Sequence, residues 1–252
     1  MTSAIILAAG RGERLGRYTQ SLPKLLVRVA GHTLLDWHIA ALRACEVHRI
    51  VVVAGYRAER IPTRNVTVIK IANWESGGPV ASLLAATPAQ LDDPFLVLYG
   101  DCPHHPDNLR AVLARDAAIV VAGDRDWLGL WSCRSPDPLA DAETYLARDG
   151  RLLEIGARAH CVDDIDAQFC GLAGFSRAGW RAALDQCARP TPPRDMTALL
   201  AALIADDEVV ADVAIRGRWC EIDTASDLRL ARSRLGHSNA WRHDWRTGTA
   251  TR

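Results

Sequence analysis

The sequence predicts an α/β fold in which a mostly parallel sheet is covered by helices on both faces. Strand and helix signals alternate through the first half of the chain, as they do in consecutive strand–helix–strand units. The strand signals are short, continuous apolar runs, which are typical of strands buried on both faces. After Gly123 the pattern changes, and the strand-rich stretch at 127–175 predicts a small insertion.

The elements of the first half follow from local patterns. Apolar and β-branched runs predict strands at 5–8, 50–54, 66–71, 95–99 and 119–122, and helices are predicted between them at 33–45, 80–86 and 107–114. The first helix has Thr33 as its N-cap and carries Leu34, Leu35 and Leu42 at helical spacing. Asp107 is the expected N-cap of the helix at 107–114.

The second half contains a hairpin signal and a late return to helices. Asp149-Gly150, between two apolar pairs, is typical of a two-residue β-hairpin turn. Further helices are predicted at 178–187, 196–205 and 226–235, and strands at 209–215 and 219–222. We therefore expect one α/β domain over residues 1–235, with a strand-rich region at about 124–175. The polar tail at 236–252 contains Trp241 and Trp245, and we interpret it as a flexible or partner-docking end.

The amino-acid composition excludes several classes of function for this chain. Thirty basic residues balance thirty acidic ones, which argues against a nucleic-acid binder that relies on neutralising phosphates. The seven cysteines include no Cys-x-x-Cys pair, as expected for reduced thiols in a cytoplasmic protein. No apolar stretch approaches the roughly 20 residues that a membrane helix needs, so we expect no membrane partner. The sequence leaves open whether the chain forms a homodimer.

A glycine-rich turn follows the first predicted strand. Gly10 and Gly12 supply free backbone N–H groups, and Arg11, Arg14 and Lys24 bring positive charge to the same place. Such a turn suits a polyanion, most simply a nucleoside triphosphate. It is no dinucleotide fingerprint, because Leu15 occupies the third glycine position, and it lacks the lysine-threonine end of a Walker A loop.

Three carboxylates are candidates for a metal site. Asp101 follows a buried strand directly, and Glu221 and Asp223 alternate along a predicted strand so that both can face one side. Carboxylate oxygens are the ligands that Mg²⁺ prefers. The alternative reading is that Asp223 or Ser226 simply caps the helix that follows.

These motifs resemble one superfamily. The stretches 7–15, 23–24, 100–101 and 219–223 are similar to the signatures of nucleotidyltransferases that activate phosphorylated small molecules with an NTP. The resemblance implies a Rossmann-like fold of the nucleotide-diphospho-sugar transferase type. It also implies that Arg14 holds the triphosphate, that Lys24 bridges the α-phosphate and the acceptor, and that Mg²⁺ is bound by Asp101, Glu221 and Asp223. Leu7, Ala9, Gly10, Arg11, Gly12 and Ser82 would then bind the nucleotide.

The middle of the chain resembles one branch of that superfamily. The stretches 124–127, 130–131, 138–143, 154–156, 168–172 and 195–197 are similar to phosphocholine cytidylyltransferases and to phosphonate-handling relatives such as 2-aminoethylphosphonate cytidylyltransferase. The resemblance implies a catalytic domain over residues 1–235, with an acceptor-binding region in the strand-rich part at about 124–175. The expected acceptor-binding residues are His104, Trp131, Arg158, Gln168 and Phe169. A quaternary ammonium group would need an aromatic cage with a carboxylate. His104, His105 and Arg158 offer neutral or positive donors instead, so we expect an anionic or neutral phosphonate; the alternative is that the two histidines are solvated loop residues.

The function that these expectations predict is a Mg²⁺-dependent transfer of CMP from CTP to a small phosphonate or phosphorylated alcohol, with release of pyrophosphate. Two enzymatic alternatives are a phosphocholine cytidylyltransferase and a sugar-1-phosphate nucleotidyltransferase that uses UTP, dTTP or GTP. A non-enzymatic alternative is a nucleotide-sensing domain on a decayed transferase fold. Retention of Arg14, Lys24, Asp101, Glu221 and Asp223 argues against decay. The sequence does not identify the acceptor, and it makes CTP only the preferred donor.

Overall fold

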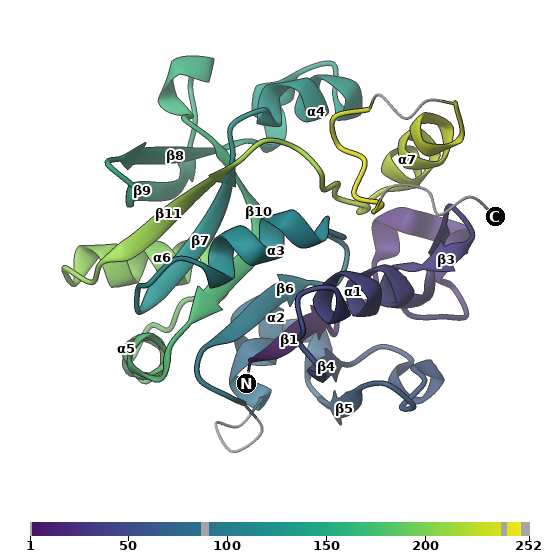
Figure 1. Cartoon of the computed structure of the whole chain (residues 1–252), viewed down its shortest axis with the longest axis horizontal. Helices are drawn as coiled ribbons and strands as arrows, with labels where there is room; N and C mark the ends of the chain where they lie inside the picture. Colours follow the sequence, from purple (N-terminus) through teal and green to yellow (C-terminus); the bar gives the residue numbers. More distant parts are fainter. Residues whose placement is uncertain (1, 87–90, 238–240, 248–252) are drawn as a thin grey trace.

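A single nine-stranded sheet organises the chain (Figure 1). The computed structural model describes residues 2–86, 91–237 and 241–247. The strands in spatial order are β5 (Thr67–Lys70), β4 (Arg49–Ala54), β1 (Ser3–Ala8), β6 (Phe95–Tyr99), β10 (Gln168–Phe175), β7 (Ile119–Asp124), β11 (Val210–Ile215), β9 (Arg151–Arg158) and β8 (Glu143–Arg148). A separate two-stranded ribbon joins β2 (Arg28–Val29) to β3 (His32–Thr33).

The sheet is mixed, where the sequence predicted a mostly parallel one. Strands β5, β4, β1 and β6 are parallel, as are β7 and β11. Strand β10 runs antiparallel between β6 and β7, and the β8–β9 hairpin extends the far edge. The predicted strand-rich insertion therefore belongs to the same sheet, because its strands add to the free edges that the parallel units leave.

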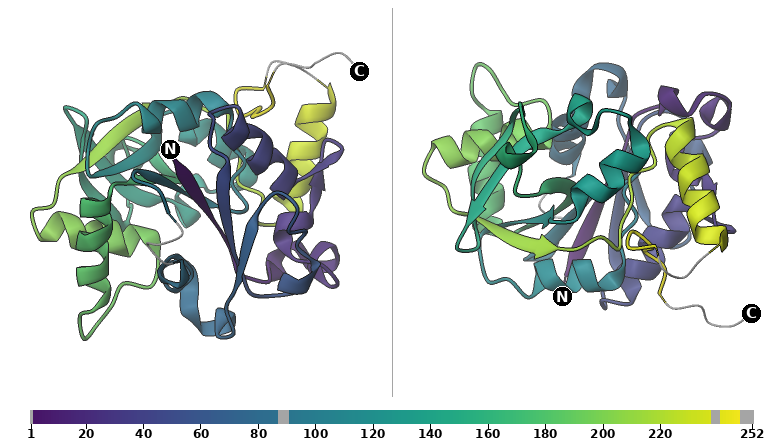
Figure 2. Two further views of the ribbon diagram at one scale, coloured as in Figure 1. Left: turned by 60° about the horizontal axis from the view of Figure 1, so that its bottom comes forward. Right: turned by 90° about the horizontal axis from the view of Figure 1, so that it is seen from above.

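Helices cover both faces of the twisted sheet, as predicted (Figures 1 and 2). Four helices pack into one hydrophobic cluster with one face of the strands: α1 (Leu34–Arg43), α3 (Pro106–Leu113), α4 (Trp127–Arg134) and α7 (Ala225–His237). The other face is covered by α2 (Trp74–Ala85), α5 (Arg177–Cys187) and α6 (Met196–Ala205). Alternate residues of β1 enter the two clusters, so the central strand is buried on both sides.

Several local expectations are confirmed. Thr33 caps α1 in a capping box with Asp36. Asp149 and Gly150 form the turn between β8 and β9, both at positive φ, which is the geometry of a type I′ hairpin. The N-cap of α3 differs from the prediction, because the ring of His105, and not Asp107, accepts the capping hydrogen bond.

Two segments predicted as strands are not strands. Trp127, Leu130 and Trp131 are buried on one side of α4, and their spacing of three and four residues is helical. The segment after β11 crosses the carboxyl end of the sheet instead of extending it. It is held there by a bridge between Trp219 and His104 and by the Ile222 N–H, which donates to the Asp101 carbonyl at 2.9 Å.

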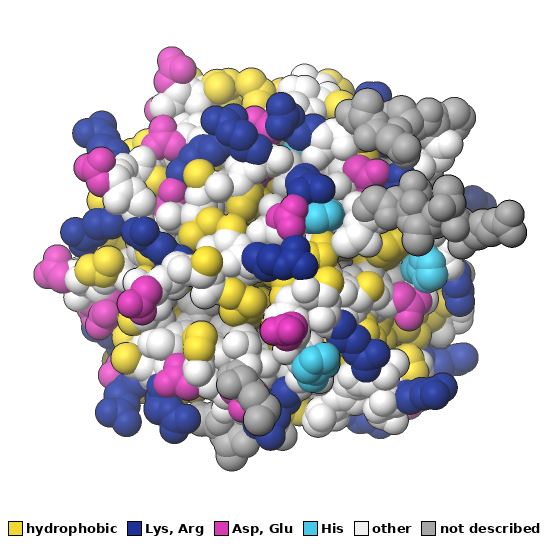
Figure 3. Space-filling view, viewed as in Figure 1, with side chains coloured by type: hydrophobic (Ala, Val, Ile, Leu, Met, Phe, Trp, Pro, Cys, Tyr) yellow, Lys and Arg dark blue, Asp and Glu magenta, His cyan; other side chains and the backbone are white. Residues whose placement is uncertain are grey.

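Charges of both signs are mixed on the face of the molecule that Figure 3 shows. On the face shown in Figure 3, the described basic and acidic side chains are interspersed, without a field of one sign. Within residues 2–86, 91–237 and 241–247, no helix is long and apolar enough to cross a membrane.

The order of the strands places the predicted site. Strand β1 has β4 on one side and β6 on the other, so the chain changes its winding direction between β1 and β6. The carboxyl ends of two such strands diverge to leave a ligand crevice. The glycine turn follows β1 and Asp101 follows β6, and the Gly100 N–H donates to the Leu7 carbonyl at 2.9 Å.

Candidate active site

The glycine turn brings Lys24 to the switch point. Gly12 has φ 68°, and a Cβ atom at this position would lie 2.9 Å from Lys24 Cδ. A side chain at residue 12 would therefore displace the lysine as well as strain the backbone. Pro23 precedes the short 3₁₀ turn Lys24–Leu26 and fixes where this turn begins.

Lys24 joins two of the predicted metal carboxylates. Its Nζ lies 2.5 Å from Asp101 Oδ2 and 2.6 Å from Asp223 Oδ1. The Arg14 guanidinium forms a further ion pair with Asp223. Side chains that follow β1, β6 and β11 in the chain thus meet in one cluster of alternating charge.

The pKa values of this cluster follow from burial and opposite charges. Burial lowers the pKa of Lys24, but the charges of Asp101 and Asp223 outweigh it and raise that pKa overall. Burial raises the pKa of Asp101, and the adjacent Lys24 reverses this, so the pKa of Asp101 lies below its usual range. Both groups are therefore charged at neutral pH.

Glu221 lies in a second ion-pair group. Arg134, at the end of α4, lies 2.5 Å from Glu221 Oε2 and 3.1 Å from Asp227 Oδ1, and its guanidinium is 5.0 Å from the centre of the Trp131 ring. Burial raises the pKa of Glu221 to about 7, aided by the negative charges of Asp101 and Asp223 and opposed by Arg134. This carboxylate therefore changes its protonation near neutral pH.

The pH dependence of turnover tests whether ionised Glu221 takes part. The ionised fraction of a group with a pKa of about 7 rises about tenfold between about pH 6 and about pH 8, and kcat/KM reports groups of the free enzyme. We expect kcat/KM for nucleotide turnover to rise by this factor and the rise to vanish in Glu221→Gln. Glu154→Gln, on the exposed side of β9, is the control and should keep the wild-type profile. A flat wild-type profile would exclude the role.

Two of the three predicted metal carboxylates, Asp101 and Asp223, are placed to share a divalent cation, and the metal role of all three stays a prediction. Within the described part of the chain, no three His, Cys, Asp or Glu side chains are arranged to hold a metal ion. Glu221 forms an ion pair with Arg134. Asp101 and Asp223 instead direct one carboxylate oxygen each to the same point, where the Lys24 ammonium lies. Oxygens of two carboxylates together with a substrate phosphate are the ligands with which proteins usually hold Mg²⁺.

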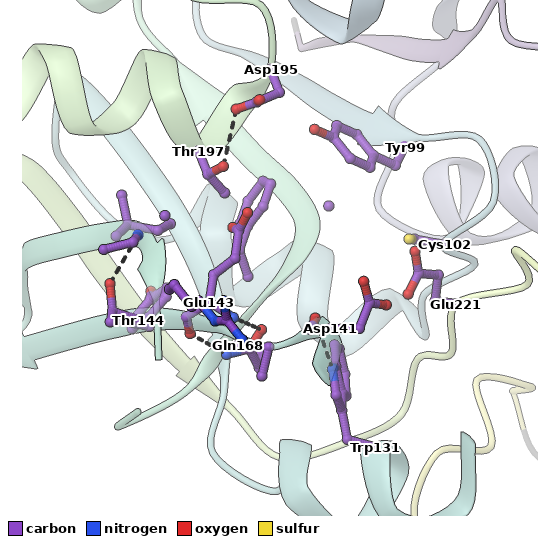
Figure 4. A pocket seen from close by; sticks show the side chains of 18 of the residues that line it. Tyr99, Cys102, Trp131, Asp141, Glu143, Thr144, Gln168, Asp195, Thr197 and Glu221 are labelled. Atoms are coloured by element: carbon purple, nitrogen blue, oxygen red, sulfur yellow. Dashed lines mark hydrogen bonds between the residues drawn. The ribbon is translucent and has the colours of Figure 1, made fainter. Parts of the chain in front are cut away.

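Two cavities meet at Arg14, which lines both. The smaller, of about 400 Å³, is lined by the glycine turn, Lys24, Asp101 and Asp223. The larger, of about 830 Å³, extends from Glu221 between β8, β9, β10 and α6. Figure 4 shows this larger cavity, with Asp141, Glu143 and Asp195 on different sides of it. We call the two the nucleotide cavity and the acceptor cavity.

Most predicted acceptor residues line the acceptor cavity, but His104 does not. Trp131, Arg158, Gln168 and Phe169 are among the lining residues. His104 is 1% exposed, stacks on the Trp219 ring and bonds to the Cys170 carbonyl through Nε2. Burial lowers its pKa to about 3, so this ring is a neutral core residue. His105 is also buried and caps α3, so the expected histidine donors are missing from the acceptor cavity.

Only some of the predicted nucleotide-binding residues line the nucleotide cavity. Leu7, Gly10 and Gly12 line the nucleotide cavity. Ala9 is buried and its carbonyl accepts from the Tyr56 N–H, while Arg11 pairs with Glu13 and lies over the Tyr56 ring. Ser82 is buried on α2, where its hydroxyl donates to the Gly78 carbonyl.

Four residues of the site were not among the sequence predictions. They are Arg134, Asp141, Glu143 and Asp195. Arg134 follows Trp131 by three residues, so a helical interpretation of this stretch would have placed the two side chains on one face. Asp195 is the N-cap of α6, where it accepts hydrogen bonds from the Ala198 N–H and the Thr197 hydroxyl. A capping role alone does not predict that it also borders a cavity.

Comparison with known proteins gives relatives along almost the whole chain. A CTP:phosphoglutamine cytidylyltransferase from Campylobacter jejuni is 29% identical over 248 residues, which cover 90% of this chain and 98% of the relative. A bifunctional IPC transferase and DIPP synthase from Rubrobacter xylanophilus is 32% identical over 241 residues, and this chain spans half of its length.

A solved structure supports the fold. The inositol-1-phosphate CTP transferase from T. maritima superposes with a TM-score of 0.72 over 96% of this chain and 98% of that chain, at 21% sequence identity. Residues 4–162, which contain the glycine turn, Lys24, Asp101 and α4, match the family described as MobA-like NTP transferase domain. With more than half of its length matched, and with the sheet and crevice described above, the chain belongs to the family of MobA-like NTP transferase domains.

Proposed function

We propose that the protein transfers a cytidylyl group from CTP to a small phosphorylated acceptor that carries an amine, and releases pyrophosphate. The observation that carries the proposal is Lys24, which is held between Asp101 and Asp223 at the switch point of the sheet. The adjoining acceptor cavity offers room for a second substrate. Two of the similar proteins are named for CTP, which favours this nucleotide as the donor.

The chemistry follows from the charges at the switch point. A phosphoryl oxygen of the acceptor attacks the α-phosphorus of CTP, a new P–O bond forms, and the bond to the β-phosphate breaks so that pyrophosphate leaves. Arg14 binds the leaving phosphates, and the Lys24 ammonium neutralises negative charge at the reacting phosphorus, where charge stabilisation supplies most of the catalysis. When bound by Asp101 and Asp223, Mg²⁺ would add further positive charge to the phosphates. Lys24 must then leave at least one carboxylate to reach the substrate.

The charge of the acceptor cavity favours an amine on the acceptor. Asp141, Glu143 and Asp195 line it together, and in the described residues neither Asp141 nor Glu143 has an ion-pair partner. Glu143 is an exposed residue whose partial loss of water contact raises its pKa; the Thr197 side chain lowers that pKa, and the neighbouring Asp195 and Asp141 raise it further. An ammonium group would relieve this repulsion. Arg14 and Arg158 are the basic residues that line this cavity, against Asp141, Glu143, Asp195 and Glu221, so its charge favours an amine-bearing acceptor over the anionic or neutral phosphonate expected from the sequence.

Glu143 should select acceptors by their amine. We expect Glu143→Gln to raise KM for 2-aminoethyl phosphate by about 30-fold, and KM for ethyl phosphate by less than about threefold, because only the first loses a charge-assisted hydrogen bond. Asp163→Asn, at an exposed position after β9, is the matched control. Equal changes for the two acceptors would contradict an ammonium subsite at Glu143.

The transfer itself is tested by its products. We expect the purified chain with CTP, Mg²⁺ and 2-aminoethyl phosphate to form equal amounts of pyrophosphate and of CMP joined to the acceptor phosphate, as identified by ³¹P NMR and mass spectrometry. CTP hydrolysis that does not depend on the acceptor would contradict a transferase. Nucleotide binding without any turnover would favour a sensing domain instead.

A further inference from the structure

Residues 241–247 of the tail, which the sequence predicted to be a flexible or partner-docking end, pack against the body of the protein; residues 238–240 and 248–252 of that tail lie outside the described part of the chain. Trp245 is 2% exposed, and its ring meets Trp37 of α1 edge-on at 6.3 Å. His243 is 4% exposed. Burial of an indole and an imidazole after the last helix shows that this segment belongs to the folded core.

The segment contacts the connection between β11 and α7. The Arg218 N–H donates to the Arg242 carbonyl at 2.7 Å. Gly217 has φ 66°, and a Cβ atom there would lie 2.5 Å from the Arg242 oxygen, so only glycine permits this approach. Arg242 also pairs with Asp126 at 3.0 Å, which ties the segment to the end of β7. In Figure 1 the yellow C-terminal segment returns beside this connection.

His243 lies against the residues that orient Trp219. Its Nδ1 lies 3.8 Å from Asp124 Oδ2; burial lowers the pKa of the ring, and Asp124 and the nearby backbone of Trp219 raise it. Asp124 is fully buried and accepts from the Trp219 indole N–H and from the Gly217 N–H, each at 2.8 Å. His243 therefore lies against the carboxylate that holds the Trp219 ring in place.

Trp219 links His243 and Asp124 to the acceptor cavity and, through the residues that follow it, to the nucleotide cavity. It lines the acceptor cavity, its ring lies 6.2 Å from that of Trp131, and it precedes Glu221 and Asp223 by two and four residues. From these contacts we infer that segment 241–245 is a positioning element of the active site. It holds the β11–α7 connection through His243 and Arg242, and so sets the place of Trp219 and of the two carboxylates, although none of its residues lines either cavity.

The test compares two buried tryptophans in the full-length chain. Trp245 anchors the segment, whereas Trp180 of α5 is 4% exposed and packs on Phe95, away from both cavities. Replacing each by leucine creates a similar defect in the core. At a temperature where both variants are folded, we expect Trp245→Leu to lower kcat/KM for the acceptor at least about tenfold, with KM for CTP changed less than about threefold, and Trp180→Leu to match the wild type.

A smaller change separates positioning from folding. His243→Ala removes the ring that lies against Asp124, and His243→Asn keeps one polar group near the Nδ1 position, which faces that carboxylate. We expect the alanine variant to lose acceptor kcat/KM about tenfold, and the asparagine variant to recover a large part of it, with equal melting temperatures for the two. Equal kinetics of Trp245→Leu and Trp180→Leu, or wild-type kinetics of His243→Ala, would overturn the inference.

The inference depends on the proposed transfer, because acceptor turnover is its readout. Different results would contradict the proposed transfer and the positioning role. If the wild-type chain shows no transfer, the proposed function is wrong; if it transfers and the variants do so equally well, only the positioning role is wrong.

Discussion

Lys24→Met lowers kcat for cytidylyl transfer by about 1000-fold, and it raises KM for CTP by less than about fivefold. This is the largest single effect that we expect, because the ammonium group meets a charge that grows as the α-phosphorus is attacked. A group that acts mainly in the transition state changes kcat more than ground-state binding. Steady-state kinetics with CTP varied at saturating acceptor measure both quantities.

The control for this variant is Lys70→Met. Lys70 ends β5 at an exposed position, so the same substitution there removes a charge without touching either cavity. It should keep wild-type kinetics. Equal losses in kcat and in CTP affinity for Lys24→Met would instead mean that Lys24 serves only to bind the triphosphate.

Asp101→Ala is expected to abolish transfer to within the detection limit, a loss of at least about 1000-fold. Asp101 is half-buried just after the carboxyl end of β6, and its Oδ2 lies 2.5 Å from Lys24 Nζ. The substitution removes one of the two proposed metal ligands and half of the charge that holds Lys24 in place. Pyrophosphate release measured over a range of Mg²⁺ concentrations should show that added metal does not restore the rate.

Asp116→Ala provides the comparison, because Asp116 is exposed between α3 and β7. Its kinetics and Mg²⁺ dependence should equal those of the wild type. If Asp101→Ala retained turnover with an unchanged Mg²⁺ optimum, Asp101 would have no part in metal binding, and Asp223 would be the remaining candidate.

Local patterns were sufficient to predict the frame of the site. The strand at 95–99 and the helix at 196–205 agree with β6 and α6, because each combines a clear apolar pattern with clear ends. The placement of Asp101 at the crevice followed from its position directly after a buried strand. The structure brings Lys24 to within 2.5 Å of Asp101 and 2.6 Å of Asp223, and the catalytic and metal-binding roles of these residues stay predictions.

The wrong predictions concern residues whose surroundings are formed by parts of the chain that lie far away in the sequence. His104 follows the predicted metal carboxylate closely and was expected at the acceptor, but Cys170 and Trp219 provide it with a buried hydrogen bond and a stacking partner. Trp245 stands in a polar tail, and its burial depends on Trp37, which lies 208 positions earlier in the sequence. Local periodicity contains no information on such pairs. Composition could not reveal the acidic acceptor cavity either, since the chain as a whole is neutral.

The most direct test of the proposed function is a matrix of pyrophosphate release, in which CTP, UTP, ATP and GTP are each combined with a panel of acceptors. The panel holds 2-aminoethyl phosphate, 2-aminoethylphosphonate, phosphocholine, ethyl phosphate and glucose 1-phosphate, so that amine, phosphonate and sugar are varied separately. We predict the highest kcat/KM for CTP with an amine-bearing acceptor, at least about tenfold above CTP with ethyl phosphate or glucose 1-phosphate. Highest turnover with a sugar 1-phosphate, or with UTP, ATP or GTP as the preferred donor, would contradict the proposal.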